Sequence, residues 1–389
     1  MTNTLKHFRL ILLALAAVTV GCAESFDPGA PASAPAGGVH ALVVSGGVAS
    51  DITIDQIEAA LNIGIGWTNG GTHVGKEFDA NPQLGDAIVA TFVWRGTSNT
   101  ITDVTDHLED GTPVGNSYTL VDYTTANGWS VATYVATNVG KYPYPSPSPD
   151  KNLAVHAIFS DVVSDAGEMI TAYRGVNPVA AVALGAHSAA SGTGSTTTIA
   201  DPGTIAVNPG ALAYSFSMSD AIVDLTGPAN FNPITAVWNT TNKIQGEYAV
   251  TSAAGTVDPQ WTWSFTAPST WFAHVVALNP QVATHLGFKV QPSSTTLPGQ
   301  TITPAVQVAV LDDQGNTVTG FNGTVTVALG HDGSLFGNAR LSGTLTVSVV
   351  NGIATFNDLS VDEPGMGYTL KASTGNLTAG TSAAFNVTL

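Results

Sequence analysis

Cysteine is almost absent from this sequence: Cys22 is the only one in 389 residues. An intrachain disulfide needs two thiols, so the chain has none. Large hydrophobic cores are stable without such cross-links, and 44% of the residues are hydrophobic. We therefore expect packing to hold the fold, and Cys22 to serve a purpose other than cross-linking.

Charge is also scarce, and positive charge most of all. Charged residues make up 10% of the chain, and 11 Lys and Arg face 28 Asp and Glu, for a formal net charge of -17. Binding to nucleic acid needs clustered cations, and so does electrostatic binding to an anionic membrane. The composition therefore argues against both partners and fits an extracellular protein.

Common catalytic and metal-binding motifs are missing as well. The nine histidines form no His-Glu-x-x-His or similar zinc pattern, and Gly-x-Ser-x-Gly does not occur as a strand-to-helix turn. His156 and His274 fall inside predicted strands, where we expect core or sheet-face histidines with satisfied hydrogen bonds. A glycosidase needs two carboxylates in one cleft, and no pair stands out. We therefore predict no catalytic residue and no cofactor.

The N-terminal residues have the pattern of an export signal. Lys6 and Arg9 precede an apolar run of about a dozen residues that ends at Gly21-Cys22. The run is too short for a transmembrane helix, which needs about 20 apolar residues. The end of the run, Gly21-Cys22, resembles the lipobox of bacterial lipoproteins, in which the cysteine is lipidated and becomes the mature N-terminus. Thr19 departs from that pattern, which usually has Leu, Val or Ile at this position.

The resemblance implies a signal peptide over residues 1–22 and a lipid on Cys22. It places the protein in the bacterial cell envelope, anchored at the outer surface, or secreted. An ordinary secretory signal cut nearby, with Cys22 incidental, is the alternative. Residues 23–38 are rich in Ala, Pro, Ser and Gly and offer little to bury, so we expect a disordered tether.

Short strand patterns fill most of the remaining chain. Residues 86–94 are apolar on both faces, as in a central strand, and Asn127-Gly128 is a good hairpin turn between strands at 118–123 and 129–135. Further strands are predicted at 40–48, 153–160, 169–176, 204–207, 211–218, 243–250, 261–265 and 271–278. Many short strands without helices between them predict an all-β fold.

One helix is predicted, over residues 51–61. Ile54, Ile57 and Leu61 have helical spacing there, and Asp51 is a suitable N-cap. Ile52 and Ile54 also alternate as in a strand, so a strand is the alternative.

Several motifs within residues 39–280 resemble a jelly-roll-like module of bacterial surface and extracellular proteins. They are Gly85-Asp86-Ala-Ile-Val-Ala, Val104-Thr-Asp106, Gly115-Asn116-Ser-Tyr118-Thr-Leu, Met169-Ile-Thr-Ala-Tyr-Arg-Gly-Val176 and Trp271-Phe-Ala-His-Val-Val-Ala-Leu278. The insertion at residues 108–114 departs from the spacing of that module. The resemblance covers roughly residues 70–280 and implies a larger β-sandwich, which we place at residues 39–280, without implying a particular activity.

A second unit is predicted over residues 284–389, after a linker at 280–284. About seven strands in about a hundred residues is the rhythm of an immunoglobulin-like sandwich. Its motifs are Val308-Ala-Val-Leu-Asp312-Asp-Gln-Gly315-Asn316, Gly352-Ile-Ala-Thr-Phe356-Asn-Asp-Leu359 and Gly367-Tyr368-Thr-Leu-Lys-Ala372. They resemble the bacterial Ig-like repeats of invasin-type surface proteins, which implies a spacer, stalk or adhesive module.

Two acidic stretches contain oxygen ligands of the kind that Ca²⁺ binds. The densest consists of Asp103, Asp106, Glu109, Asp110 and Asn116. It lacks the Asp-x-Asp-x-Asp-Gly loop, so a solvated acidic loop is preferred over a calcium site. Residues 312–316 have the Asp-x-x-Gly-Asn pattern of an inter-strand turn, and we prefer that interpretation.

Tryptophan is well represented, with seven residues. Trp261 and Trp263 share one face of a predicted strand, and other segments supply Trp94, Trp129, Trp238 and Trp271. Exposed indoles would stack on sugar rings. A tryptophan-rich core between two sheets is the preferred interpretation, because alternating strands commonly bury aromatic side chains.

These patterns predict a monomeric, non-catalytic surface protein for binding or adhesion, with a glycan or an extracellular protein as partner and membrane contact only through its lipid. The alternative is a surface carbohydrate-active or other hydrolytic enzyme that uses the first domain. Exposed tryptophan without converging carboxylates favours binding, whereas a cleft with two carboxylates about 5–10 Å apart favours hydrolysis.

Overall fold

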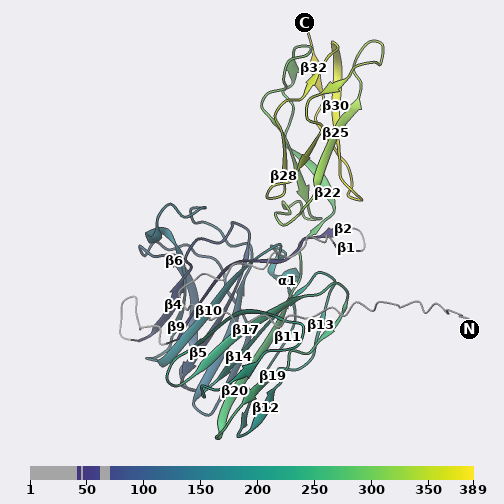
Figure 1. Cartoon of the computed structure of the whole chain (residues 1–389). Coiled ribbons are helices and arrows are strands. Elements are labelled where there is room, and N and C mark those ends of the chain that lie inside the picture. The colour runs from purple at the N-terminus through teal and green to yellow at the C-terminus, as the bar shows by residue number, and fades with distance from the viewer. Residues whose placement is uncertain (1–41, 45–46, 62–70) are drawn as a thin grey trace, which may run out of the picture. The chain divides into compact units, whose positions relative to one another are not determined.

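The computed structural model describes residues 42–44, 47–61 and 71–389 (Figure 1). The predicted signal peptide at 1–22, with Cys22, and the tether at 23–38 lie outside the described residues. The described part is all-β, as predicted, and its helical elements are α1 (Ala180–Ala183) and η1 (Pro149–Lys151). Within this part, no helix has the length and apolar character needed to cross a membrane.

Two five-stranded antiparallel sheets form a sandwich. In order across the first sheet, the strands are β3 (Thr53–Leu61), β10 (Ser164–Arg174), β5 (Ala87–Arg95), β8 (Trp129–Ala136) and β7 (Thr119–Ala126). Those of the second are β11 (Leu184–Gly194), β20 (Ser269–Leu278), β14 (Leu212–Ser219), β17 (Lys243–Val250) and β16 (Asn232–Trp238). Val89 and Met169 of the first sheet pack against Tyr214 and Phe272 of the second, all fully buried. The sandwich confirms the predicted fold class.

Smaller sheets cover the outer faces of this sandwich. The first sheet is covered by β4 (His73–Glu77), β9 (Leu153–Phe159) and β6 (Ile101–Leu108). The second is covered by β12 (Thr197–Ala200), β19 (Trp261–Ser264) and β15 (Leu225–Thr226), and by β13 (Ile205–Val207) with β18 (Gly255–Val257). These outer layers explain why β5 is apolar on both faces: Val89 faces the inner core, and Trp94 faces the outer one.

Polar side chains also lie in the inner core, and several of them form one hydrogen-bonded network around His274. His274 of β20 lies between the two sheets, where its Nε2 is 2.7 Å from Thr124 Oγ1 and its Nδ1 is 3.0 Å from Thr133 Oγ1. Thr133 Oγ1 is also 3.1 Å from Thr91 Oγ1, which in turn is 3.0 Å from the Tyr214 hydroxyl. His274 is 1% exposed, and burial lowers its pKa to about 3. The network therefore holds a neutral imidazole, as expected of a satisfied core histidine.

The C-terminal sheets comprise residues 285–387. Three of their strands are β22 (His285–Val290), β24 (Val306–Leu311) and β28 (Ile353–Phe356). The largest sheet contains β23 (Thr295–Thr296), β32 (Phe385–Val387), β30 (Gly365–Ser373), β25 (Thr324–His331) and β27 (Thr346–Ser348), with β31 (Gly380–Thr381) beside β30. The last pair is β26 (Leu341–Ser342) with β29 (Ser360–Val361). Their core includes Val308, Val325, Tyr368 and Phe385. Seven of the eleven strands in this part have at least three residues.

One prediction about local structure is wrong, and one segment contains a strand that was not predicted. Most of the predicted helix at 51–61 is strand β3, which pairs with β10 from Thr53↔Arg174 to Leu61↔Gly167. The predicted linker contains a short strand, β21 (Val282–Ala283), which pairs with β2 (Gly47–Ala49). β2 also pairs with β1 (Leu42–Val44). In both places, hydrogen bonding to a distant strand outweighs the local pattern.

Candidate functional site

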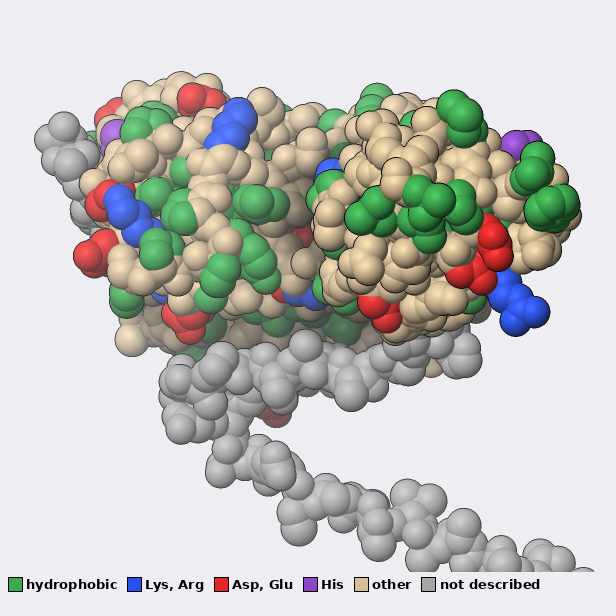
Figure 2. All heavy atoms as spheres, turned by 90° about the horizontal axis from the view of Figure 1, so that it is seen from above, with side chains coloured by type: hydrophobic (Ala, Val, Ile, Leu, Met, Phe, Trp, Pro, Cys, Tyr) green, Lys and Arg blue, Asp and Glu red, His purple; other side chains and the backbone are tan. Residues whose placement is uncertain are grey.

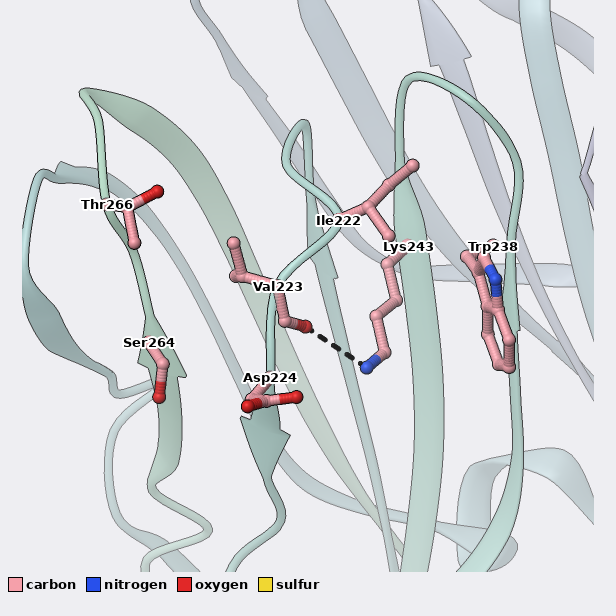
Figure 3. Close-up of a pocket in the computed structure, with 7 residues that line it drawn as sticks. All are labelled: Ile222, Val223, Asp224, Trp238, Lys243, Ser264 and Thr266. Atoms are coloured by element: carbon pink, nitrogen blue, oxygen red, sulfur yellow. Dashed lines mark hydrogen bonds between the residues drawn. The ribbon is translucent and has the colours of Figure 1, made fainter. Parts of the chain in front are cut away.

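Trp238 is the one exposed tryptophan among the six that the structure describes. Its exposed fraction is 60%, whereas that of Trp94, Trp261 and Trp263 is 0%. It lies at the end of β16 and helps to line a pocket of about 360 Å³ (Figure 3). The other lining residues are Ile222, Val223, Asp224, Lys243, Ser264 and Thr266.

A tight hairpin turn places Trp238 opposite Lys243. The two residues are partners at the adjoining ends of β16 and β17. Between them, the side-chain oxygen of Asn239 accepts hydrogen bonds from the backbone N–H groups of Thr241 at 2.7 Å and Asn242 at 2.8 Å. An asparagine that bonds to the backbone two and three residues ahead stabilises such a turn. The turn therefore holds the backbone of Trp238 opposite that of Lys243.

The facing wall of the pocket comes from β19 and from the segment that leads into β15. The backbone N–H of Ser264 donates to the carbonyl of Asp224 at 3.0 Å, which joins these two segments. Along β19 the side chains alternate: Trp263 is buried beneath the strand, and Ser264 lines the pocket. The indole N–H of Trp263 donates to Ser217 Oγ of β14 at 3.0 Å. A buried anchor thus positions an exposed hydroxyl.

The pocket combines an apolar surface with a few polar groups. Lys243 Nζ donates to the carbonyl of Val223 at 3.2 Å and lies 5.8 Å from the centroid of the Trp238 ring (Figure 3). Partial burial lowers the pKa of Lys243, and the nearby Asp224 carboxylate opposes that shift. The lining therefore includes the indole, one cation, one anion and two hydroxyl groups, with Lys243 beside the indole and Ser264 and Thr266 on the opposite side (Figure 3). A ligand with one apolar face and several hydroxyl groups fits this chemistry.

The other predicted tryptophan positions belong to the core. Trp261 and Trp263 share one face of β19, as predicted, and their indoles bond to Ser215 and Ser217. Trp129 is 4% exposed, and Trp271 is partly buried. The preferred interpretation, a tryptophan-rich core, is confirmed for Trp94, Trp129, Trp261 and Trp263. Trp271 is partly buried against that core, and Trp238 is exposed.

In the structure, the acidic residues of the stretch 103–116 do not form one cluster. Asp106 is fully buried and accepts hydrogen bonds from the backbone N–H groups of Gly115 at 2.8 Å and Asn116 at 3.0 Å, and from the Asn116 side chain at 2.6 Å. Asp110 instead pairs with Lys151 at the surface. Asp106 thus closes the inserted loop. Across residues 42–44, 47–61 and 71–389, no three His, Cys, Asp or Glu residues are placed to hold a metal ion.

Residues 312–316 form the expected turn between strands. Asp312 Oδ1 accepts from the backbone N–H groups of Gln314 at 3.1 Å and Asn316 at 2.7 Å. Gly315 has a φ of 82°, a conformation that glycine adopts without strain.

Carboxylates converge in pairs outside the lining of the Trp238 pocket, among them Asp55 with Asp86, Glu58 with Asp79, and Asp201 with Asp258. Asp55 and Asp86 both accept from the backbone N–H of Gln83, at 2.8 and 3.1 Å, and Asp55 also pairs with Arg174. Burial, followed by the neighbouring Asp55, raises the pKa of Asp86 to about 8. Asp86 is 1% exposed, so its carboxyl does not face solvent. Asp55, Asp86 and Arg174 therefore connect the ends of β3, β5 and β10 and do not flank a cleft.

Sequence reasoning weighed Trp238 only as one of several aromatic residues, and it missed the rest of the pocket. The lining residues come from three separated segments, 222–224, 238–243 and 264–266, which no short motif joins. Exposure is the property that distinguishes Trp238, and it follows from the position of the residue at the end of the edge strand β16. No protein family model matches this chain, and a search of curated proteins found no match.

Proposed function

We propose that this protein is a non-catalytic cell-surface binding protein and that the Trp238 pocket receives a sugar ring of a glycan. The observation that carries the proposal is an indole 60% exposed at the wall of a pocket lined by Asp224, Lys243, Ser264 and Thr266. Elsewhere in the described sheets, tryptophan side chains are buried or partly buried.

The chemistry of a pyranose matches the two kinds of surface in the pocket. One face of the ring presents C–H groups, which pack on an aromatic face, and its edge presents hydroxyls. Asp224 accepts hydrogen bonds from such hydroxyls, and Ser264 and Thr266 both accept and donate. A concave site with an apolar wall and a few polar groups is the usual form of a small-ligand site.

The same pocket argues against the hydrolytic alternative. Glycoside hydrolysis generally uses two carboxyl groups on opposite sides of the scissile bond. Asp224 is the single acidic residue among the seven described residues that line the pocket. In the pair Asp55 and Asp86, Asp86 is closed off from solvent. Glu58, whose pKa burial raises to about 7 beside Asp79, is paired with Lys76 at 3.6 Å and lies outside the pocket. Binding without bond cleavage is therefore the function that this geometry supports best.

A glycan array tests the proposal. Wild type is expected to bind a subset of pyranose-containing glycans, and Trp238→Ala is expected to weaken that binding at least about tenfold, because truncation removes the stacking surface. Trp238→Phe should restore part of the affinity, since it retains an aromatic face. The matched control is Leu120→Ala, which removes another exposed apolar side chain (49% exposed) and should leave binding unchanged. If the Trp238→Ala variant binds the same glycans with the affinity of the wild type, the proposed site is refuted.

We also propose that Cys22 carries a lipid, that residues 23–38 act as a tether, and that residues 284–389 act as an invasin-type Ig-like spacer. The support is the signal-like N-terminal sequence and the motifs of the C-terminal part. Cys22→Ala is expected to move most of the protein from the membrane fraction to the soluble fraction, because it removes the attachment atom. Membrane retention of the Cys22→Ala variant at the wild-type level would contradict the anchor.

A further inference from the structure

Three large apolar side chains of the C-terminal sheets are almost fully exposed. Leu335 is 86% exposed, Phe336 is 84% exposed, and Met366 is 71% exposed. Figure 2 shows groups of hydrophobic side chains on a surface with few charges. Single exposed apolar residues are ordinary, but neighbouring large ones commonly mark an interaction site.

Backbone contacts bring the two segments of this surface together. Leu335 and Phe336 lie between β25 and β26, and Met366 lies near the start of β30. An antiparallel bridge joins Ser334 to Gly365, and the N–H of Met366 donates to the carbonyl of Gly333 at 3.1 Å. We call Leu335, Phe336 and Met366 the apolar tip.

The loop that carries the apolar tip is held by its own polar side chains. Asp332 accepts from the backbone N–H groups of Ser334 at 2.9 Å and Ala339 at 3.1 Å. Ser334 Oγ accepts from the N–H groups of Gly337 at 3.0 Å and Asn338 at 3.3 Å. These bonds fix the backbone on both sides of Leu335 and Phe336. A partner therefore meets a loop that is already ordered, which reduces the entropic cost of binding.

The groups around the base of this loop are mainly acidic. The carboxylates of Asp332, Glu363 and Asp362 all act on the Tyr368 hydroxyl and raise its pKa, after the larger effect of burial. That hydroxyl donates to the carbonyl of Glu363 at 2.9 Å. The basic residues near these carboxylates are Arg340, whose backbone N–H donates to Asp362 at 2.7 Å, and His331, whose imidazole acts on Asp332. The three carboxylates outnumber these two basic residues, so the rim of the apolar tip is negatively charged.

This charge decides between three kinds of occupant. An anionic bilayer would repel the rim, and a second copy of this chain carries the same net negative charge, formally -17. A protein pocket bordered by Lys or Arg would attract it, and would also bury the apolar side chains. We propose that the apolar tip docks into an apolar, basic-rimmed pocket of another protein.

A random peptide library displayed on phage is a suitable probe for this surface. Selection on the full chain is expected to enrich peptides with aromatic or aliphatic residues flanked by Lys or Arg. Phe336→Ser should weaken a selected peptide at least about tenfold, as expected of an aromatic anchor. Glu363→Gln should weaken it less and reduce its sensitivity to salt. The matched control is Val350→Ser, which changes another residue that is 68% exposed and should leave peptide affinity unchanged.

Other results would overturn the proposal. Enriched peptides that lack basic residues, or that bind Phe336→Ser as well as wild type, would remove its basis. Sedimentation of the wild type as a dimer, with Phe336→Ser a monomer, would instead identify a second copy as the occupant. Flotation of the wild type, but not of Phe336→Ser, with unmodified phosphatidylcholine vesicles would identify a bilayer. Both proteins are prepared without the lipid on Cys22, so that the anchor does not contribute.

Discussion

Acidification from near pH 7 to about pH 4 is expected to lower the free energy of unfolding by about 3 kcal/mol through His274 alone. Burial between the two sheets lowers the pKa of His274 from 6.5 to about 3. The unfolded chain therefore takes up a proton below about pH 6.5, while the folded chain does not. The contribution of His274 to stability is fully present above pH 6.5 and is lost as the pH falls towards 3.

Denaturant unfolding at the two pH values, compared between wild type and His274→Gln, measures this contribution. Glutamine does not titrate and retains a donor and an acceptor for Thr124 and Thr133. The variant is expected to be less stable than wild type near pH 7 and to lose about 3 kcal/mol less on acidification. His156, whose pKa burial also lowers to about 3, contributes equally to both proteins and cancels in the comparison. Equal pH dependence of the two proteins would show that the pKa of His274 is the same in the folded and the unfolded chain, which contradicts the prediction.

Trp263→Ala is expected to lower the free energy of unfolding by about 3–5 kcal/mol, the usual range for removing a fully buried aromatic side chain. Trp263 is 0% exposed, and its ring stacks on Phe265 with centroids 5.8 Å apart and planes 3° apart. The variant also leaves Ser217 without the indole N–H that it accepts. The cavity lies between β14 and β19, so the strand that carries Ser264 should lose its support.

The exposed Trp238 provides a control of the same residue type. Trp238→Ala removes as many atoms as Trp263→Ala, but from a side chain that is 60% exposed. It is expected to lower the free energy of unfolding by less than about 1 kcal/mol. Thermal unfolding followed by circular dichroism compares the two variants. Similar losses of stability would contradict the distinction between a tryptophan of the core and a tryptophan of the binding surface.

Strands with a clear two-sided pattern are the part of this fold that the sequence predicts well. β5 and the hairpin of β7 and β8 are found where expected, and Asn127 and Gly128 have the positive φ values of 48° and 84° that their turn requires. The strand β3 is mistaken for a helix because its isoleucines satisfy both periods, and only pairing with β10 decides between them.

Layers and exposure are harder to predict, because they depend on contacts between distant segments. The sequence of β11 is rich in Ala, Ser and Gly and has no strand pattern of its own, yet it pairs with β20 along most of its length. Trp238 and Trp263 have the same side chain and lie in neighbouring sheets. They differ in exposure. Trp263 is buried because it lies between its own strand in the outer layer and the face of β14, whereas Trp238 lies at the end of an edge strand.

The most direct test of the proposed function is the indole N–H resonance of Trp238 during titration with a glycan that the array identifies. The resonance is assigned to Trp238 because it is missing from the spectrum of the Trp238→Phe variant. Stacking of a sugar ring is expected to shift it progressively with glycan concentration, while the resonances of the buried Trp94, Trp261 and Trp263 stay in place. A bound glycan that leaves the Trp238 resonance unmoved would contradict the assignment of this pocket as the glycan site.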